Sequence, residues 1–129
     1  MIETSMYPTV INEELHLSNF SLTTMAKKLN EECVEVVEAV AFYQVERIIA
    51  KGTKNEYLKD IIDDLMQELL DVNQMSLNML YRLKKQQDLS SVDIKKAVLK
   101  HNLKLEQRGW ECDYSLKMGM EIMEGEENV

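Results

Sequence analysis

The chain has 129 residues, a formal net charge of −8, one proline, four glycines and two cysteines. Its length predicts a single domain over 1–129. Its negative net charge argues against a nucleic-acid partner, because proteins that bind nucleic acids usually have a basic face. The longest apolar run, residues 39–43, is too short to cross a membrane, and no secretory signal begins the chain. We therefore expect a soluble, cytoplasmic protein without membrane or nucleic-acid contacts.

The first long helix is expected to begin after a cap at Ser21, Thr23 or Thr24 and to continue to Lys51, with Gly52 ending it. Before it, residues 11–20 are expected to form one or two helical turns at most. Apolar side chains recur at helical spacing along the long helix, and these are Leu22, Met25, Leu29, Cys33, Val36 and Val40. This periodicity predicts that Cys33 is a buried, small apolar residue.

Two further helices complete the predicted fold. The second covers about 56–87 and, because the preceding loop is short, should return antiparallel to the first. The third begins after Ser90 or Ser91 and stops at Gly109. Residues 110–129 form a tail whose acidic end should fray. The sequence thus predicts an all-α, antiparallel helical bundle with its core in about 22–109.

The first helix is apolar over more than one face. Beyond the periodic stripe it carries further apolar side chains, namely Val34, Val37, Ala41, Val45 and Ile48. A helix that is apolar on more than one side is buried on more than one side. This arc therefore predicts a homodimer or homotetramer.

Two acidic motifs, Glu31-Glu32-x-x-Glu35 and Glu68-x-x-Asp71, lie on the first and second helices. Like charges at these spacings cost an isolated helix about 0.2–0.5 kcal/mol per pair, and no basic residue follows one turn later to offset them. At about 100° per residue, both motifs border the apolar stripe of their helix, so they can face one cleft. Carboxylates that converge without basic partners are typical ligands of Mg²⁺. A solvated acidic face is the alternative for either motif alone.

A basic element follows on the third helix, where Lys104 and Arg108 lie one turn apart and Asn102 is close in sequence. Placed opposite an acidic metal cluster, such groups form a clamp for a polyphosphate. The alternative is that both cations only complement the dipole at the end of the helix.

Together these motifs resemble the all-α nucleoside triphosphate pyrophosphohydrolases, the superfamily of the MazG proteins, dimeric dUTPases, dCTP pyrophosphatases and phosphoribosyl-ATP pyrophosphatase. The resemblance covers about 22–109, with Cys33-Val34 where the first motif often has Gly or Leu, and Leu105 where Phe is common. It implies hydrolysis of a nucleoside triphosphate, NTP or dNTP, between the α- and β-phosphates to the monophosphate and pyrophosphate. The base and the sugar are not specified by the motifs.

The resemblance also implies a role for each motif residue. The ligands of Mg²⁺, or of Mn²⁺ in its place, would be Glu32, Glu35, Glu68 and Asp71. Glu31 would support these ligands or act as the base that orients the attacking water. The side chains that contact phosphate or sugar would be Asn102, Lys104 and Arg108.

Two other functions compete with this interpretation. A di-iron carboxylate bundle needs two Glu-x-x-His motifs. Only Glu13-x-x-His16 fits, because Val98 stands three residues before His101. The stronger alternative is a non-catalytic nucleotide-binding or regulatory bundle that keeps the fold without the chemistry.

Overall fold

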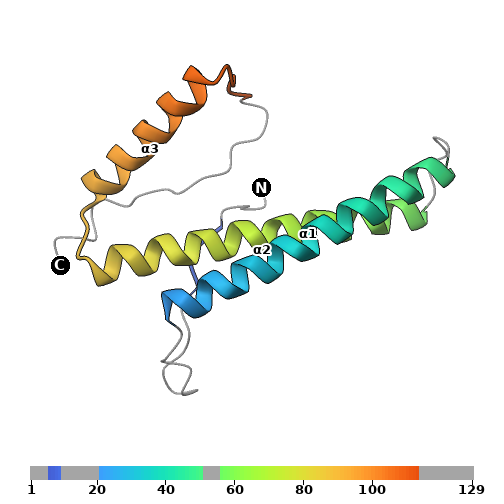
Figure 1. The fold of residues 1–129 in the computed structure, drawn as a ribbon, viewed down its shortest axis with the longest axis horizontal. Helices are drawn as coiled ribbons and strands as arrows, with labels where there is room; N and C mark the ends of the chain where they lie inside the picture. Colours follow the sequence, from blue (N-terminus) through green and yellow to red (C-terminus); the bar gives the residue numbers. More distant parts are fainter. Residues whose placement is uncertain (1–5, 10–20, 51–55, 114–129) are drawn as a thin grey trace, which may run out of the picture. The chain divides into compact units, whose positions relative to one another are not determined.

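The computed structural model describes residues 6–9, 21–50 and 56–113. Its secondary structure consists of α1 (Leu22–Ala50), α2 (Glu56–Gln86) and α3 (Ser91–Gln107), shown in Figure 1. No strand occurs in these ranges, which confirms the all-α prediction. Within the same ranges, no helix combines the length and apolar character needed to span a membrane. The predicted turns in 11–20, the stop at Gly52 and the tail from 114 onward lie outside the described residues.

The start of α1 distinguishes among the three predicted caps. The hydroxyl oxygen of Ser21 accepts a hydrogen bond from the backbone N–H of Thr24 at 3.2 Å. The N–H of Met25 donates to the carbonyl of Ser21 at 2.9 Å. Ser21 therefore caps α1, because its side chain satisfies an N–H that has no partner within the first turn.

The end of α2 is a tight reversal with one residue in the left-handed region. Asp88 has φ of 48°. The N–H of Leu89 donates to the carbonyl of Lys84 at 3.0 Å, and that of Asp88 donates to Lys85 at 3.4 Å. This is the pattern of a Schellman motif, in which glycine usually holds the position that Asp88 has here. The helix ends one residue before the predicted bound.

Both ends of α3 have side-chain or backbone caps. Ser90 and Asp93 form a capping box, with the Asp93 N–H donating to Ser90 Oγ at 3.3 Å and the Ser90 N–H donating to Asp93 Oδ2 at 3.0 Å. At the other end Gly109 has φ of 83°, and the N–H of Trp110 donates to the carbonyl of Leu105 at 3.1 Å. The predicted start and the glycine stop are confirmed, with Ser90 rather than Ser91 as the cap.

The chain divides into two compact units, Pro8–Met79 and a second that comprises Met1–Tyr7 and Leu80–Val129. In the first unit, α1 and the larger part of α2 lie side by side and run in opposite directions, as predicted (Figure 1). Met25 and Ile61 are its buried apolar side chains among the described residues, and Ile94 is buried in the second unit. The prediction of one domain over 1–129 stays a prediction.

The outer surface of α1 is apolar and exposed. Side chains that the single chain leaves uncovered are Val34, Val37, Phe42, Val45, Ile48 and Ile49. Cys33 is exposed as well, so the prediction of a buried thiol is wrong. The physical reason is that α2 covers one stripe of α1, whereas the apolar arc of α1 extends well beyond that stripe.

A short N-terminal segment is anchored to α2 within the first unit. The backbone N–H of Thr9 donates to Asn78 Oδ1 at 2.7 Å, and Asn78 Nδ2 donates to Thr9 Oγ1 at 2.8 Å. Gln74 Nε2 also donates to Asn78 Oδ1, at 2.9 Å. One amide side chain thus joins residues 69 positions apart in sequence.

Candidate metal centre

Three carboxylates from two helices converge in the first unit. Glu32 comes from α1, and Glu68 and Asp71 come from α2. One oxygen of each lies within 4.8 Å of the others. Glu68 and Asp71 are three residues apart on α2, so their side chains share a face, and the antiparallel packing brings Glu32 to the same place. The structure therefore brings together both acidic motifs, as their positions on the helices predicted.

The three side chains differ in their access to water. The side chain of Glu32 is 11% exposed, Glu68 is partly buried and Asp71 is exposed. The inner side of the site, at Glu32, is therefore largely shielded from water, and the outer side, at Asp71, is open to it. A charged group on the inner side needs a partner, because burial removes the water that would otherwise stabilise it.

Glu35 lies beside this cluster, one turn after Glu32. Its pKa is raised, first by the hydrogen bond that its protonated carboxyl donates to Glu68 and next by the negative charge of Glu32. Crowded carboxylates thus favour a shared proton in the absence of another cation. Glu35 is not one of the three residues whose oxygens converge within 4.8 Å, although it contacts two of them.

One oxygen of Glu68 has no hydrogen-bond partner. Glu68 Oε2 is buried, and within the described residues no donor reaches it. An unpaired buried carboxylate oxygen costs free energy, so most such atoms in proteins bind a donor, a water or an ion. A cation bound on the inner side of the cluster would therefore stabilise the Glu68 carboxylate.

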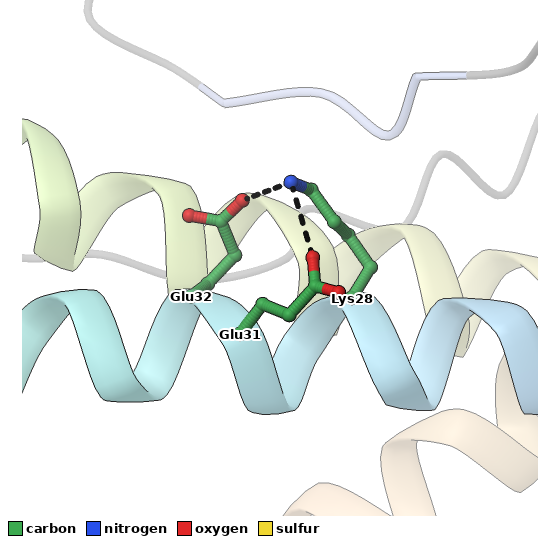
Figure 2. A network of polar contacts seen from close by, with 3 residues as sticks. All are labelled: Lys28, Glu31 and Glu32. Carbon is green, nitrogen blue, oxygen red and sulfur yellow. Dashed lines mark ion pairs between the residues drawn. The ribbon is translucent and has the colours of Figure 1, made fainter.

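Lys28 contradicts the prediction that the first motif has no basic partner. Its Nζ lies 3.1 Å from Glu32 Oε1 and 3.7 Å from Glu31 Oε2 (Figure 2). The prediction considered only residues one turn after each acid, whereas Lys28 stands one turn before both. No described basic side chain of the first unit forms an ion pair with Glu35, Glu68 or Asp71.

Glu31 occupies the outer side of α1. Its side chain is 66% exposed and contacts the cluster through Lys28, not by direct convergence with the other carboxylates. In the same way Asp64, one turn before Glu68, is exposed and lies outside the converging set. The structure thus separates an inner group of acids from two solvated neighbours.

The predicted phosphate clamp lies in the second unit. Asn102 and Lys104 are exposed on α3, and Arg108 is the exposed C-cap residue of that helix. Neither Lys104 nor Arg108 has an ion-pair partner within the described part of its own unit. The contact of these residues with a nucleotide stays a prediction.

Comparisons of the chain with protein families, curated proteins and solved structures found no match.

Proposed function

We propose that this protein is a Mg²⁺-dependent nucleotide pyrophosphohydrolase that cuts an NTP or dNTP between the α- and β-phosphates. The observation that carries the proposal is the convergence of Glu32, Glu68 and Asp71 within 4.8 Å, from two helices that each pack the acids at the border of an apolar stripe. The buried, unpartnered oxygen of Glu68 supports it independently. Residue spacing alone does not produce either feature.

The geometry of the cluster fits a small divalent ion. Ligands about 2.1 Å from an octahedral ion are separated by about 3.0 or 4.2 Å. The carboxylate oxygens of the cluster lie within 4.8 Å of one another, so small side-chain rotations would bring them to these separations. All donors are carboxylate oxygens, which Mg²⁺ and Mn²⁺ prefer over nitrogen or sulfur.

In the proposed mechanism, Glu32, Glu35, Glu68 and Asp71 would hold the ion. The chemistry that Mg²⁺ supplies when bound is to offset the charge of the phosphates and to make water more acidic. The exposed side of the cluster, at Asp71, is where the phosphates enter, because the opposite side is closed by the packed helices.

Two further steps fall to side chains near the ligands. Glu31 supports the cluster or takes a proton from the attacking water, whose oxygen bonds to phosphorus as the P–O bond of the α–β bridge breaks and the monophosphate and pyrophosphate separate. It is suited to this because it is solvated and close to Glu32, and because its carboxylate can accept a hydrogen bond from water. Asn102, Lys104 and Arg108 contact the phosphates or the sugar.

The proposed active form is a homodimer or homotetramer. The exposed apolar face of α1, which includes Val37 at 69% and Ile48 at 73% exposure, is the surface that we expect a second copy to cover. Few apolar side chains are buried among the described residues, so association would supply core that a helical pair lacks by itself.

The test is product analysis with a panel of NTPs and dNTPs, with and without Mg²⁺. Metal-dependent release of a monophosphate and pyrophosphate is the expected result. Release of a diphosphate and orthophosphate would mean that another bond is cut and would contradict the proposal. Nucleotide binding without turnover would support the non-catalytic alternative.

A further inference from the structure

Lys28 is the one feature of the site that the proposed reaction leaves without a role. Its ammonium contacts Glu32 Oε1 at 3.1 Å and Glu31 Oε2 at 3.7 Å, as Figure 2 shows. The Lys28 side chain is 44% exposed, whereas that of Glu32 is 11% exposed. A partly exposed cation is therefore paired with a largely buried acid.

The same carboxylate is also a proposed ligand of the divalent ion. A single negative charge on Glu32 attracts either cation, but the two cations repel each other when both are close to it. Lys28 is positively charged at neutral pH, because the ordinary pKa of lysine is about 10.4. Ion binding and the Lys28–Glu32 pair therefore compete.

A phosphate is the natural second partner of the displaced ammonium. Lysine has a flexible four-carbon stem and three donors, and it binds phosphate as a compact charge. Phosphates bound at the ion would lie near Glu32, whose carboxylate Lys28 contacts at 3.1 Å while its own side chain is 44% exposed.

We propose that Lys28 is a phosphate-binding residue whose ammonium exchanges Glu32 for a phosphate oxygen of the nucleotide when the divalent ion binds. This inference rests on the proposed function. It adds a residue that lies outside both acidic motifs and outside the predicted phosphate clamp. The exchange couples the two ligands, since the ion weakens the contact that keeps Lys28 away from the phosphate.

The test compares Lys28→Met with Lys27→Met, an equivalent change at the exposed neighbouring position. Mn²⁺ affinity is first measured without nucleotide, by electron paramagnetic resonance. Because Lys28→Met removes the competing cation, we expect Mn²⁺ to bind about threefold more tightly, as is reasonable for a partly exposed ion pair. Lys27→Met should bind Mn²⁺ like the wild type.

Pyrophosphate affinity is then measured at saturating Mn²⁺ by calorimetry. Loss of a charged donor should weaken pyrophosphate binding about tenfold in Lys28→Met, and Lys28→Arg should restore most of it. A merely structural Lys28 would not combine tighter ion binding with weaker phosphate binding. Circular dichroism checks the helical content of each variant, and Lys28→Gln replaces Lys28→Met if the latter does not fold.

Unchanged or weaker Mn²⁺ binding by a folded Lys28 variant would overturn the exchange, and so would unchanged pyrophosphate affinity. In either case the proposed function stands if the wild type binds Mn²⁺ and cleaves nucleotides. A wild-type protein that binds no Mn²⁺ would instead overturn the metal centre and this inference with it.

Discussion

The two halves of α1 differ in what destabilises them: crowded negative charge in the first half and exposed apolar surface in the second. The first half, up to Glu35, contributes carboxylates that crowd against those of α2. The second half contributes Val37, Val45 and Ile48, which are 69%, 54% and 73% exposed. Charge crowding is relieved by a cation, whereas exposed apolar area is relieved only by another apolar surface. One helix thus combines a proposed ligand site with a proposed subunit interface, and the two can be perturbed separately.

The largest expected effect is on the acidic half. Glu68→Ala should lower nucleotide hydrolysis by about 100-fold or more, because a bound ion supplies several kcal/mol of transition-state stabilisation. The helical circular dichroism and the oligomeric state should not change, since Glu68 is on α2 and is not part of the exposed apolar face of α1. Asp63→Ala, an exposed acid on the same helix, is the matched control. Full activity in Glu68→Ala would exclude the second motif from the site.

Ion binding should also stabilise the fold. At a free Mg²⁺ concentration about 100 times its dissociation constant, the free energy of unfolding should rise by about 2.7 kcal/mol. Thermal denaturation with and without Mg²⁺ measures this change. In Glu68→Gln the Mg²⁺-dependent rise should disappear. A rise of equal size in that variant would place the ion elsewhere.

The apolar half is tested by Val45→Glu. A carboxylate at a position that a second copy covers should raise the dissociation constant of the oligomer by about 30-fold, the effect typical of an important interface residue. Light scattering coupled to size exclusion measures the change, with Gln44→Glu as the control at an exposed polar neighbour. Mn²⁺ affinity should stay within twofold. A wild-type protein that is monomeric at high concentration would refute the interface.

Asp93 differs from the crowded acids, because its carboxylate accepts hydrogen bonds from the backbone and the side chain of Ser90. The pKa of Asp93 is lowered, first by the backbone hydrogen bond from Ser90 and next by the Ser90 side chain. Its contribution to stability is therefore complete above the pKa of the unfolded carboxyl, about 3.9, and is lost as pH falls through the lower folded-state value.

We therefore expect the stability difference between wild type and Asp93→Asn to be constant above about pH 5 and to shrink below pH 4. Chemical denaturation across this range measures it, with Glu106→Gln on the same helix as control. A difference that does not depend on pH would mean that the Asp93 charge is unimportant to the cap.

The smallest effect is expected where α2 ends, in the second unit. Asp88 has φ of 48°, a conformation that glycine adopts without steric strain. Asp88→Gly should therefore raise the free energy of unfolding by about 0.5 kcal/mol, whereas Asp88→Ala should not. Urea denaturation measures both, and equal stability of the two variants would contradict the backbone argument.

Local signals in the sequence predicted most of the fold. The cap positions of α1 and α3, the stop at Gly109 and the apolar periodicity depend on residues within one or two turns, so they can be recognised without knowing the tertiary structure. The sequence left each cap open among two or three neighbouring residues, and the hydrogen bonds of the structure identify Ser21 and Ser90. That the two acidic motifs can face one cleft was predicted for the same reason, because each acid has a definite angle to its own apolar stripe. Which of the acids converge, namely Glu32, Glu68 and Asp71, was not predicted from these angles.

Other features of the site follow from contacts that no local signal describes. Lys28 was missed although the signal was present, since it stands three and four residues before Glu31 and Glu32. The exposure of Cys33 depends on how much of α1 is covered by α2, and the Thr9–Asn78 bonds join distant segments.

By itself the sequence determined that the chain forms three long helices, about where they lie, and which face of each is acidic or apolar, because backbone capping and helical periodicity act over a few residues. The tertiary structure decided which carboxylates meet, that Glu68 Oε2 is buried without a partner, and that the outer face of α1 remains exposed. Those properties depend on the register between two packed helices, which arises from many weak contacts distributed over both.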